Sequence, residues 1–239
     1  MQLFYCPGIN GESFYTLPDQ EMHHAVHVLR MKPGDGLQIT NGKGKIFDAE
    51  IVSVQKKECT VKILSSYLQN RSRNYHLHIA IAPPKSSDRV DVFLEKVTEI
   101  GVEEITPIYS NNSERNKVNH EKVLQVLIAA MKQSGDAYLP KLNGLTKLED
   151  FIYQHNLSSS QKFIAHCKPS DKKVFTRVLQ PAKDVLILIG PEGDFTAEEI
   201  LLSEKNNFTS VSLGEKRLRT ETAGIVACQT VHSINALKT

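Results

Sequence analysis

The hydrophobic pattern of this 239-residue chain changes its period near residue 70. Within residues 46–54, apolar and polar side chains alternate with the two-residue period of a half-buried strand. Later segments alternate instead between short apolar strands and amphipathic helices, such as residues 87–100, where apolar side chains recur at every third or fourth position. This change predicts a small antiparallel β-barrel over residues 1–70 and an α/β domain with a parallel sheet over residues 71–239.

The composition is that of a folded protein. It includes 40% hydrophobic residues, and its 29 Lys and Arg nearly balance its 27 Asp and Glu, which excludes a disordered protein and gives no overall basic field. The four cysteines lack the C-x-x-C spacing of zinc and redox sites, so we expect reduced thiols and a cytoplasmic protein. The N-terminus lacks a basic region followed by a long apolar run, so we expect neither a signal peptide nor a membrane span.

Two clusters of basic side chains leave alternatives open. Residues 56–89 carry seven Lys or Arg against two acids, a pattern that fits either a nucleic-acid contact or a solvated surface. His23, His24 and His27 have the spacing of one helix face, but the sequence offers no clear further ligand for a metal. We therefore expect no metal, and histidines that lie on the surface or face RNA.

Two strand–loop–helix junctions stand out, because the common phosphate-binding, dinucleotide-binding, zinc-protease and serine-hydrolase motifs are missing from the sequence. In residues 189–195, glycines bracket a tight loop. Acidic side chains at the following helix start disfavour a phosphate there and favour a neutral or cationic ligand. Residues 213–223 carry Arg217 and Arg219, with hydroxyl groups placed to cap the last helix.

These two loops allow two interpretations. If their strands are neighbours in the sheet, the loops frame one pocket at the carboxyl ends of the strands, where ligands bind in α/β proteins. Alternatively, each loop is an ordinary structural turn with helix capping. Capping boxes at residues 146–149 and 196–199 predict two helix starts.

Several spaced segments together resemble the RsmE family of trefoil-knotted SPOUT methyltransferases. They are residues 23–35, residues 85–107, Gln133-Ser134 with Leu139-Pro140, residues 189–195 and residues 213–223. The resemblance implies an N-terminal PUA-like RNA-binding β-barrel and a C-terminal knotted SPOUT α/β domain, arranged as a homodimer. It also implies S-adenosylmethionine as cofactor, and methylation of N3 of a uridine in 16S rRNA of the small ribosomal subunit.

The same resemblance implies the cofactor-binding residues, whereas the catalytic and RNA-binding assignments are hypotheses from the chemistry of the reaction. Arg219 is expected to stabilise the uridine oxygens, and Glu221 is a candidate for the base that accepts the N3 proton, with no metal involved. The expected cofactor-binding residues are His166, Ile189, Gly190, Pro191, Glu192, Gly193, Leu213, Gly214, Leu218, Arg219, Thr220, Thr222 and Ala223. The expected RNA-binding residues are Arg30, Lys85, Arg89, Arg115 and Gln133.

The chain departs from the family pattern at three positions. The family usually has an acid in place of Lys132, an arginine in place of Asp136 and a further glycine in place of Asp194. The first two departures affect an expected RNA contact near Ser134, and the third affects the flexibility of the loop. Two other functions stay open: a noncatalytic RNA-binding or ribosome-assembly factor with this fold, and a knotted methyltransferase with a different RNA target.

Overall fold

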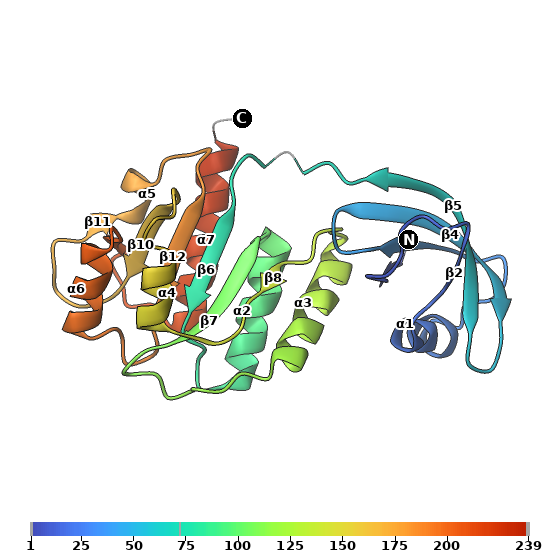
Figure 1. The fold of residues 1–239 in the computed structure, drawn as a ribbon, viewed down its shortest axis with the longest axis horizontal. Helices are drawn as coiled ribbons and strands as arrows, with labels where there is room; N and C mark the ends of the chain where they lie inside the picture. The colour runs from blue at the N-terminus through green and yellow to red at the C-terminus, as the bar shows by residue number, and fades with distance from the viewer. Residues whose placement is uncertain (1, 72, 238–239) are drawn as a thin grey trace. The chain divides into compact units, whose positions relative to one another are not determined.

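Two compact units make up the computed structural model, which describes residues 2–71 and 73–237 (Figure 1). Unit 1 comprises Met1–Ser72 with Ile128–Leu139, and unit 2 comprises Arg73–Leu127 with Pro140–Thr239. The elements in chain order are β1 (Leu3–Tyr5), β2 (Phe14–Thr16), α1 (Asp19–His23), the π-helical turn η1 (His24–Val28), β3 (Gly36–Thr40), β4 (Lys45–Val54), β5 (Cys59–Leu68), β6 (Leu77–Ile81), α2 (Ser87–Ile100), β7 (Glu104–Tyr109), α3 (His120–Ser134), β8 (Lys141–Leu142), β9 (Thr146–Lys147), α4 (Leu148–Gln154), β10 (Gln161–Ala165), β11 (Lys173–Val174), α5 (Phe175–Val178), β12 (Val185–Ile189), α6 (Ala197–Lys205), β13 (Thr209–Ser212) and α7 (Thr220–Ala236).

A five-stranded sheet in the order β1-β3-β4-β5-β2 forms the centre of unit 1. The alternation predicted for residues 46–54 is confirmed in β4, where Phe47, Ala49 and Ile51 are buried. The pairs among β2, β3, β4 and β5 are antiparallel, as predicted, but β1 pairs with β3 in parallel. Strands β1 and β2 were not predicted, because three residues are too few to show a period.

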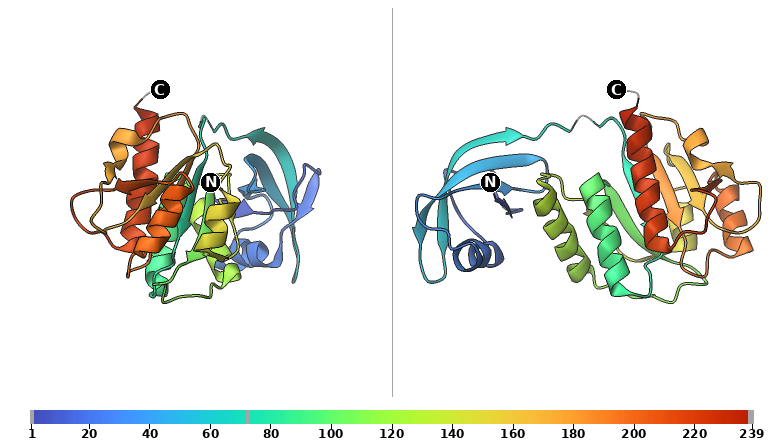
Figure 2. Two further views of the ribbon diagram at one scale, coloured as in Figure 1. Left: turned by 60° about the vertical axis from the view of Figure 1, so that its left-hand side comes forward. Right: turned by 180° about the vertical axis from the view of Figure 1, so that it is seen from behind.

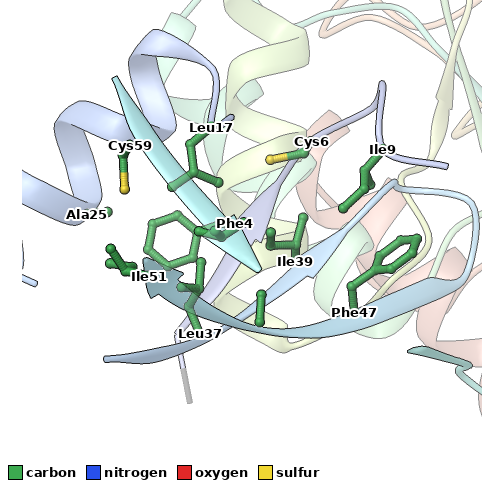
Figure 3. Packing of buried hydrophobic residues seen from close by; sticks show 12 residues of the cluster. Phe4, Cys6, Ile9, Leu17, Ala25, Leu37, Ile39, Phe47, Ile51 and Cys59 are labelled. Carbon is green, nitrogen blue, oxygen red and sulfur yellow. The ribbon is translucent and has the colours of Figure 1, made fainter. Parts of the chain in front are cut away.

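Apolar side chains from several strands converge in one core in unit 1 (Figure 3). Phe4 from β1, Ile39 from β3 and Phe47 from β4 are fully buried there. Cys6 belongs to the same cluster, and burial raises the pKa of its thiol to about 12. All four cysteines of the chain are free, and a protonated buried thiol such as Cys6 packs as a small apolar group.

The histidine-rich segment forms α1 and continues directly into η1. The rings of His23 and His27 lie 5.1 Å apart, whereas the ring of His24 packs edge-on against Phe4 at 5.9 Å. The three imidazoles therefore do not share one face, because one of them packs against the core. Among the described residues, no group of three or more His, Cys, Asp and Glu side chains is arranged to hold a metal ion.

A largely buried ion pair, formed by Lys132 and Glu21, anchors residues 128–139 within unit 1. The Nζ of Lys132 donates to both carboxylate oxygens of Glu21, at 2.7 and 2.8 Å, and the two side chains are 18% and 10% exposed. The hydroxyl of Thr40 adds a hydrogen bond to the carbonyl of Ala137 at 3.2 Å. Lys132, one of the departures from the family pattern, thus has a structural partner of opposite charge.

Replacing Lys132 by methionine should lower the free energy of unfolding by about 3–5 kcal/mol, because Glu21 is left as an unpaired buried charge. The double variant E21M/K132M should recover most of that loss, since two apolar side chains then replace the whole pair. As a control, Lys96→Met breaks the more exposed pair with Glu99 and should cost at most about 1 kcal/mol. Urea unfolding measures these differences. A Lys132→Met variant as stable as Lys96→Met would contradict the account.

Unit 2 is a parallel sheet with helices on both faces (Figure 1 and Figure 2). Its strands lie in the order β11-β13-β10-β12-β6-β7-β8, with β9 also paired to β7. Within the described part of unit 2, every pairing of these strands is parallel. Helices α2 and α7 pack together on one face, and α4 and α6 lie on the other. The predicted strand–helix alternation and parallel sheet are confirmed. Every helix in the described part of the chain is too short or too polar to span a bilayer.

The capping boxes predicted the helix starts with unequal success. The box of Thr196 and Glu199 is confirmed at the start of α6, where the Glu199 N–H donates to the Thr196 hydroxyl at 3.2 Å and the Thr196 N–H donates to Oε2 of Glu199 at 2.8 Å. The helix predicted from residues 146–149 is confirmed as α4, which begins at Leu148, but the capping box itself does not form. Thr146 and Lys147 instead form β9 beside β7, and this strand pairing delays the start of α4.

Candidate active site

A cavity of about 760 Å³ opens at the carboxyl ends of β10, β12 and β13 in unit 2. Cavities of this size hold small-molecule ligands and cofactors, and in α/β proteins they occur at this edge of the sheet. Gly193 and Thr222, both expected to bind the cofactor, lie outside its lining. The other expected cofactor-binding residues line it: His166, Ile189, Gly190, Pro191, Glu192, Leu213, Gly214, Leu218, Arg219, Thr220 and Ala223.

The two loops frame one cavity although their strands are not neighbours. Strand β10 lies between β12 and β13, so the adjacency considered from the sequence is wrong. The loop after β13 reaches the loop after β12 through two hydrogen bonds. The Thr220 hydroxyl donates to the carbonyl of Gly190 at 3.0 Å, and Nη2 of Arg217 donates to the carbonyl of Glu192 at 2.9 Å. The cavity is therefore the space that both loops enclose at the end of β10.

Thr220 uses its hydroxyl to join the loops and not to cap α7. A capping side chain must come from the residue before the helix, and that residue is Arg219, which makes no side-chain cap. The capping of α7 by hydroxyl groups predicted from the sequence is therefore wrong. Thr220 is the first residue of the helix, and its buried hydroxyl bonds to Gly190 instead.

The loop after β12 is also held by the loops around it. Oε1 of Glu192 accepts a hydrogen bond from the N–H of Lys85 at 3.0 Å. Nδ2 of Asn112 donates to the carbonyls of Gly193 and Asp194, at 3.3 and 2.9 Å. A Cβ at Gly193 would lie 3.0 Å from the Cβ of Asn112, so a larger residue would be crowded here and glycine suits this close approach. The main chain of the loop is consequently fixed before any ligand binds.

His166, directly after β10, lines the cavity, and its imidazole is buried. It is 6% exposed, and neither ring nitrogen has a hydrogen-bond partner of normal geometry among the described residues. Burial is the main cause that lowers the pKa of His166, followed by the charge of Lys172, while Asp194 acts in the opposite direction. The ring is therefore neutral at pH 7, with one nitrogen able to donate and one able to accept. Both ring nitrogens have almost no accessible surface, so the ring is packed into the wall of the cavity.

The two candidate catalytic residues differ in their surroundings. Arg219 is exposed and lines the cavity. Glu221 is 8% exposed and is not part of the lining. Its Oε1 lies 3.8 Å from Nε of Arg89, and its Oε2 has no hydrogen-bond partner among the described residues. Of the two, only Arg219 is placed to touch a ligand in the cavity.

Two of the expected RNA-binding residues border the loop after β12. The N–H of Lys85 bonds to Glu192 in that loop, and Nη2 of Arg115 donates to the carbonyl of Lys85 at 2.7 Å. Nζ of Lys85 pairs with Glu114 at 2.7 Å. The remaining three are Arg89 in unit 2 and the exposed Arg30 and Gln133 in unit 1.

Comparison with known protein families shows what kind of protein has this cavity. A family model described as an RNA methyltransferase domain matches residues 70–232, and one described as an RNA methyltransferase PUA domain matches residues 17–64. The ribosomal RNA small subunit methyltransferase E of Buchnera aphidicola is 30% identical over 220 residues, which cover 90% of this chain and 85% of that protein. The chain belongs to the RsmE family of RNA methyltransferases.

Solved structures agree with membership of the RsmE family. A structure described as a probable rRNA-methyltransferase from Porphyromonas gingivalis is 38% identical and covers 100% of both chains, with a TM-score of 0.92. The ribosomal RNA small subunit methyltransferase E of Neisseria gonorrhoeae, bound to S-adenosyl methionine, is 27% identical and covers 98% of both chains, with a TM-score of 0.86. The expected fold class, a SPOUT α/β domain with a PUA-like β domain, is confirmed.

The cavity of this RsmE family member also includes residues that the sequence analysis did not predict. Most lie within or beside the two loop motifs, so their motif position could have indicated them. Lys172 lies in a stretch without a motif, and its Nζ donates to the carbonyls of His166 and Lys168 at 3.0 and 2.8 Å. No sequence pattern predicts that contact. The polar residues missed are Cys167, Lys172, Asp194, Ser212, Glu215, Lys216 and Arg217.

Replacing Thr220 by valine should lower the free energy of unfolding by about 1–3 kcal/mol, because the buried carbonyl of Gly190 loses its donor. Thr220→Ser keeps the hydroxyl and should lose less. Urea unfolding of both variants measures the difference. Equal losses in the two variants would show that the methyl group, and not the hydroxyl, matters at this position.

Proposed function

We propose that this chain transfers a methyl group from S-adenosylmethionine to N3 of a uridine in 16S rRNA. The observation that carries the proposal is the cavity where the loops after β12 and β13 meet at the end of β10, joined by the hydrogen bond from Thr220 to Gly190. Membership of the RsmE family supports it. The likeness to the Neisseria enzyme, which was solved with S-adenosyl methionine bound, supports the choice of cofactor.

The residues around the cavity fit S-adenosylmethionine. At Gly214 no atom lies within 4 Å of the place of a Cβ, so a ligand can approach the main chain closely there. Glu198 and Glu199 in the first turn of α6 disfavour a phosphate at that helix start. When bound, the sulfonium supplies an activated methyl group. The task left to the chain is to align the uridine, and such positioning contributes roughly 7–11 kcal/mol to lowering a barrier.

Arg219 is the proposed catalytic residue. Uridine N3 carries a proton at neutral pH, and its lone pair attacks only as that proton leaves. The guanidinium of Arg219 stabilises the negative charge that then develops on the uridine oxygens. Glu221 is the candidate acceptor for the proton, since its Oε2 has no hydrogen-bond partner among the described residues. Because Glu221 lies outside the cavity lining, we assign the larger catalytic share to Arg219.

We further propose that residues 1–70 form the RNA-binding domain and residues 71–239 the catalytic domain. The match of residues 17–64 to the PUA domain of RNA methyltransferases supports this division.

Uridine N3 lies on the base-pairing edge, so the target must be unpaired or extruded from a helix. The proposed RNA contacts are Arg30, Lys85, Arg89, Arg115 and Gln133. If the basic residues contact phosphates, the affinity for rRNA falls steeply with salt. A flat salt response would contradict that assignment.

A homodimer and a trefoil knot in the C-terminal domain complete the proposal, and both rest on the resemblance to SPOUT methyltransferases. A cytoplasmic location follows from the rRNA substrate and is consistent with four free cysteines. The small ribosomal subunit or its 16S rRNA is the proposed partner.

Replacing Arg219 by alanine should lower kcat by about 10²–10³-fold, the usual loss when one donor that stabilises developing charge is removed. Arg177→Ala, which removes an exposed arginine from α5, is the matched control and should leave kcat unchanged. Transfer of labelled methyl groups to 16S rRNA at saturating cofactor measures both variants. Full turnover by Arg219→Ala would exclude this residue from catalysis.

Two measurements test the function as a whole. Calorimetric titration with S-adenosylmethionine separates an enzyme from a noncatalytic RNA-binding factor, because the factor should give no heat. Mass-spectrometric mapping of rRNA from a strain that lacks this chain then identifies the target. Loss of a single N3-methyluridine from 16S rRNA is the expected result. Loss of a different modification would favour a knotted methyltransferase with another RNA target.

A further inference from the structure

Asp194 lies in the loop after β12, and its main chain has a φ of 64°. This left-handed conformation favours glycine, although Asp and Asn adopt it more readily than other residues because their short side chains bond locally. The contacts of the Asp194 carboxylate therefore matter at this position.

The carboxylate of Asp194 accepts two hydrogen bonds from the main chain. Oδ1 accepts from the N–H of Phe195 at 2.8 Å, and Oδ2 accepts from the N–H of Cys167 at 2.7 Å. Cys167 follows β10, whereas Asp194 belongs to the loop after β12, the strand paired with β10. The bond to Cys167 therefore joins two loops that line the same cavity.

The peptide group between His166 and Cys167 is held at both of its polar atoms. Its oxygen accepts from Nζ of Lys172 at 3.0 Å, and its N–H donates to Asp194. This peptide group joins His166 and Cys167, and both of these residues line the cavity. Lys172 and Asp194, which have opposite charges, thus hold this peptide group in place.

The loop that presents the carboxylate is itself fixed. The carbonyl of Asp194 accepts a hydrogen bond from Nδ2 of Asn112 at 2.9 Å, and its N–H donates to the carbonyl of Pro191 at 2.9 Å. These bonds do not depend on the carboxylate, so they persist when the side chain is removed. Through its hydrogen bond with the N–H of Cys167, the side chain of Asp194 ties the end of β10 to this loop.

We infer that Asp194 is a positioning residue for the cofactor, an inference that rests on the function proposed above. It holds the peptide between His166 and Cys167, so that this wall of the cavity is preorganised for the ligand. Without the carboxylate, binding has to restrict that peptide, and this entropic cost weakens affinity. Arg219 acts from the other loop, so the change should affect cofactor binding and not the methyl-transfer step.

Asp194→Gly tests the inference, because glycine suits the φ of 64° and the variant removes both bonds without main-chain strain. We expect the Kd for S-adenosylmethionine, measured by calorimetry, to rise about tenfold, which is about 1.4 kcal/mol. The KM for the cofactor should rise in parallel, and kcat should stay within about twofold. In the protein without ligand, the amide hydrogen of Cys167 should exchange faster with solvent.

Two further variants make the result specific. Asp171→Gly removes an exposed carboxylate close to Lys172 in the sequence and outside the cavity lining, and it should leave Kd unchanged. Asp194→Asn tolerates the same main chain and offers one acceptor in place of two, so its Kd should lie between those of the wild type and Asp194→Gly. The asparagine variant also gives an answer if the glycine variant fails to fold.

The outcomes separate this inference from the proposed function. A wild-type protein that binds no S-adenosylmethionine would contradict both. A wild-type protein that binds it, together with an Asp194→Gly variant that binds it equally well, would contradict the inference alone. A variant that is less stable to heat but keeps the wild-type Kd would likewise show a purely structural role and overturn the inference.

Discussion

The hydrogen bond from the Thr220 hydroxyl to the Gly190 carbonyl is the contact on which the site depends. It joins the loops after β13 and β12, whose strands are separated in the sheet by β10. Both partners are buried, so a broken bond would leave a carbonyl without a donor and without water. The bond from Arg217 to Glu192 links the same loops at an exposed position, where competition with water makes it weaker. The buried bond therefore keeps the loops together.

The parallel sheet makes this junction possible. Because β10 is parallel to both β12 and β13, the carboxyl ends of all three lie at one edge, and their loops emerge beside one another. Helix α7 continues from the second loop and packs against α2, β6 and β12. Gly224 permits that approach, since a Cβ there would come within 2.5 Å of the ring of Phe93. The segment from residue 213 to residue 236 thus closes the cavity and also covers the sheet.

The parts that the sequence predicted correctly depend on local pattern, and the parts that it missed depend on contacts between distant residues. The period of residues 46–54 and the Thr196 capping box are readable because neighbours along the chain decide them. The strand placement of Thr146 depends on pairing with β7, which no local pattern shows. Likewise, Lys132 is only a departure from a motif until the structure shows its partner 111 positions away, Glu21. The motif residues indicated the cavity, and tertiary packing decided which strand lies beneath it.

A crystal structure of the chain grown with S-adenosylmethionine tests the central claim most directly. The account predicts the cofactor between residues 190–192 and residues 213–220, in the cavity that His166 also lines. Cofactor density at any other place on the molecule, or the same two loops closed around their own side chains at saturating cofactor, would contradict it.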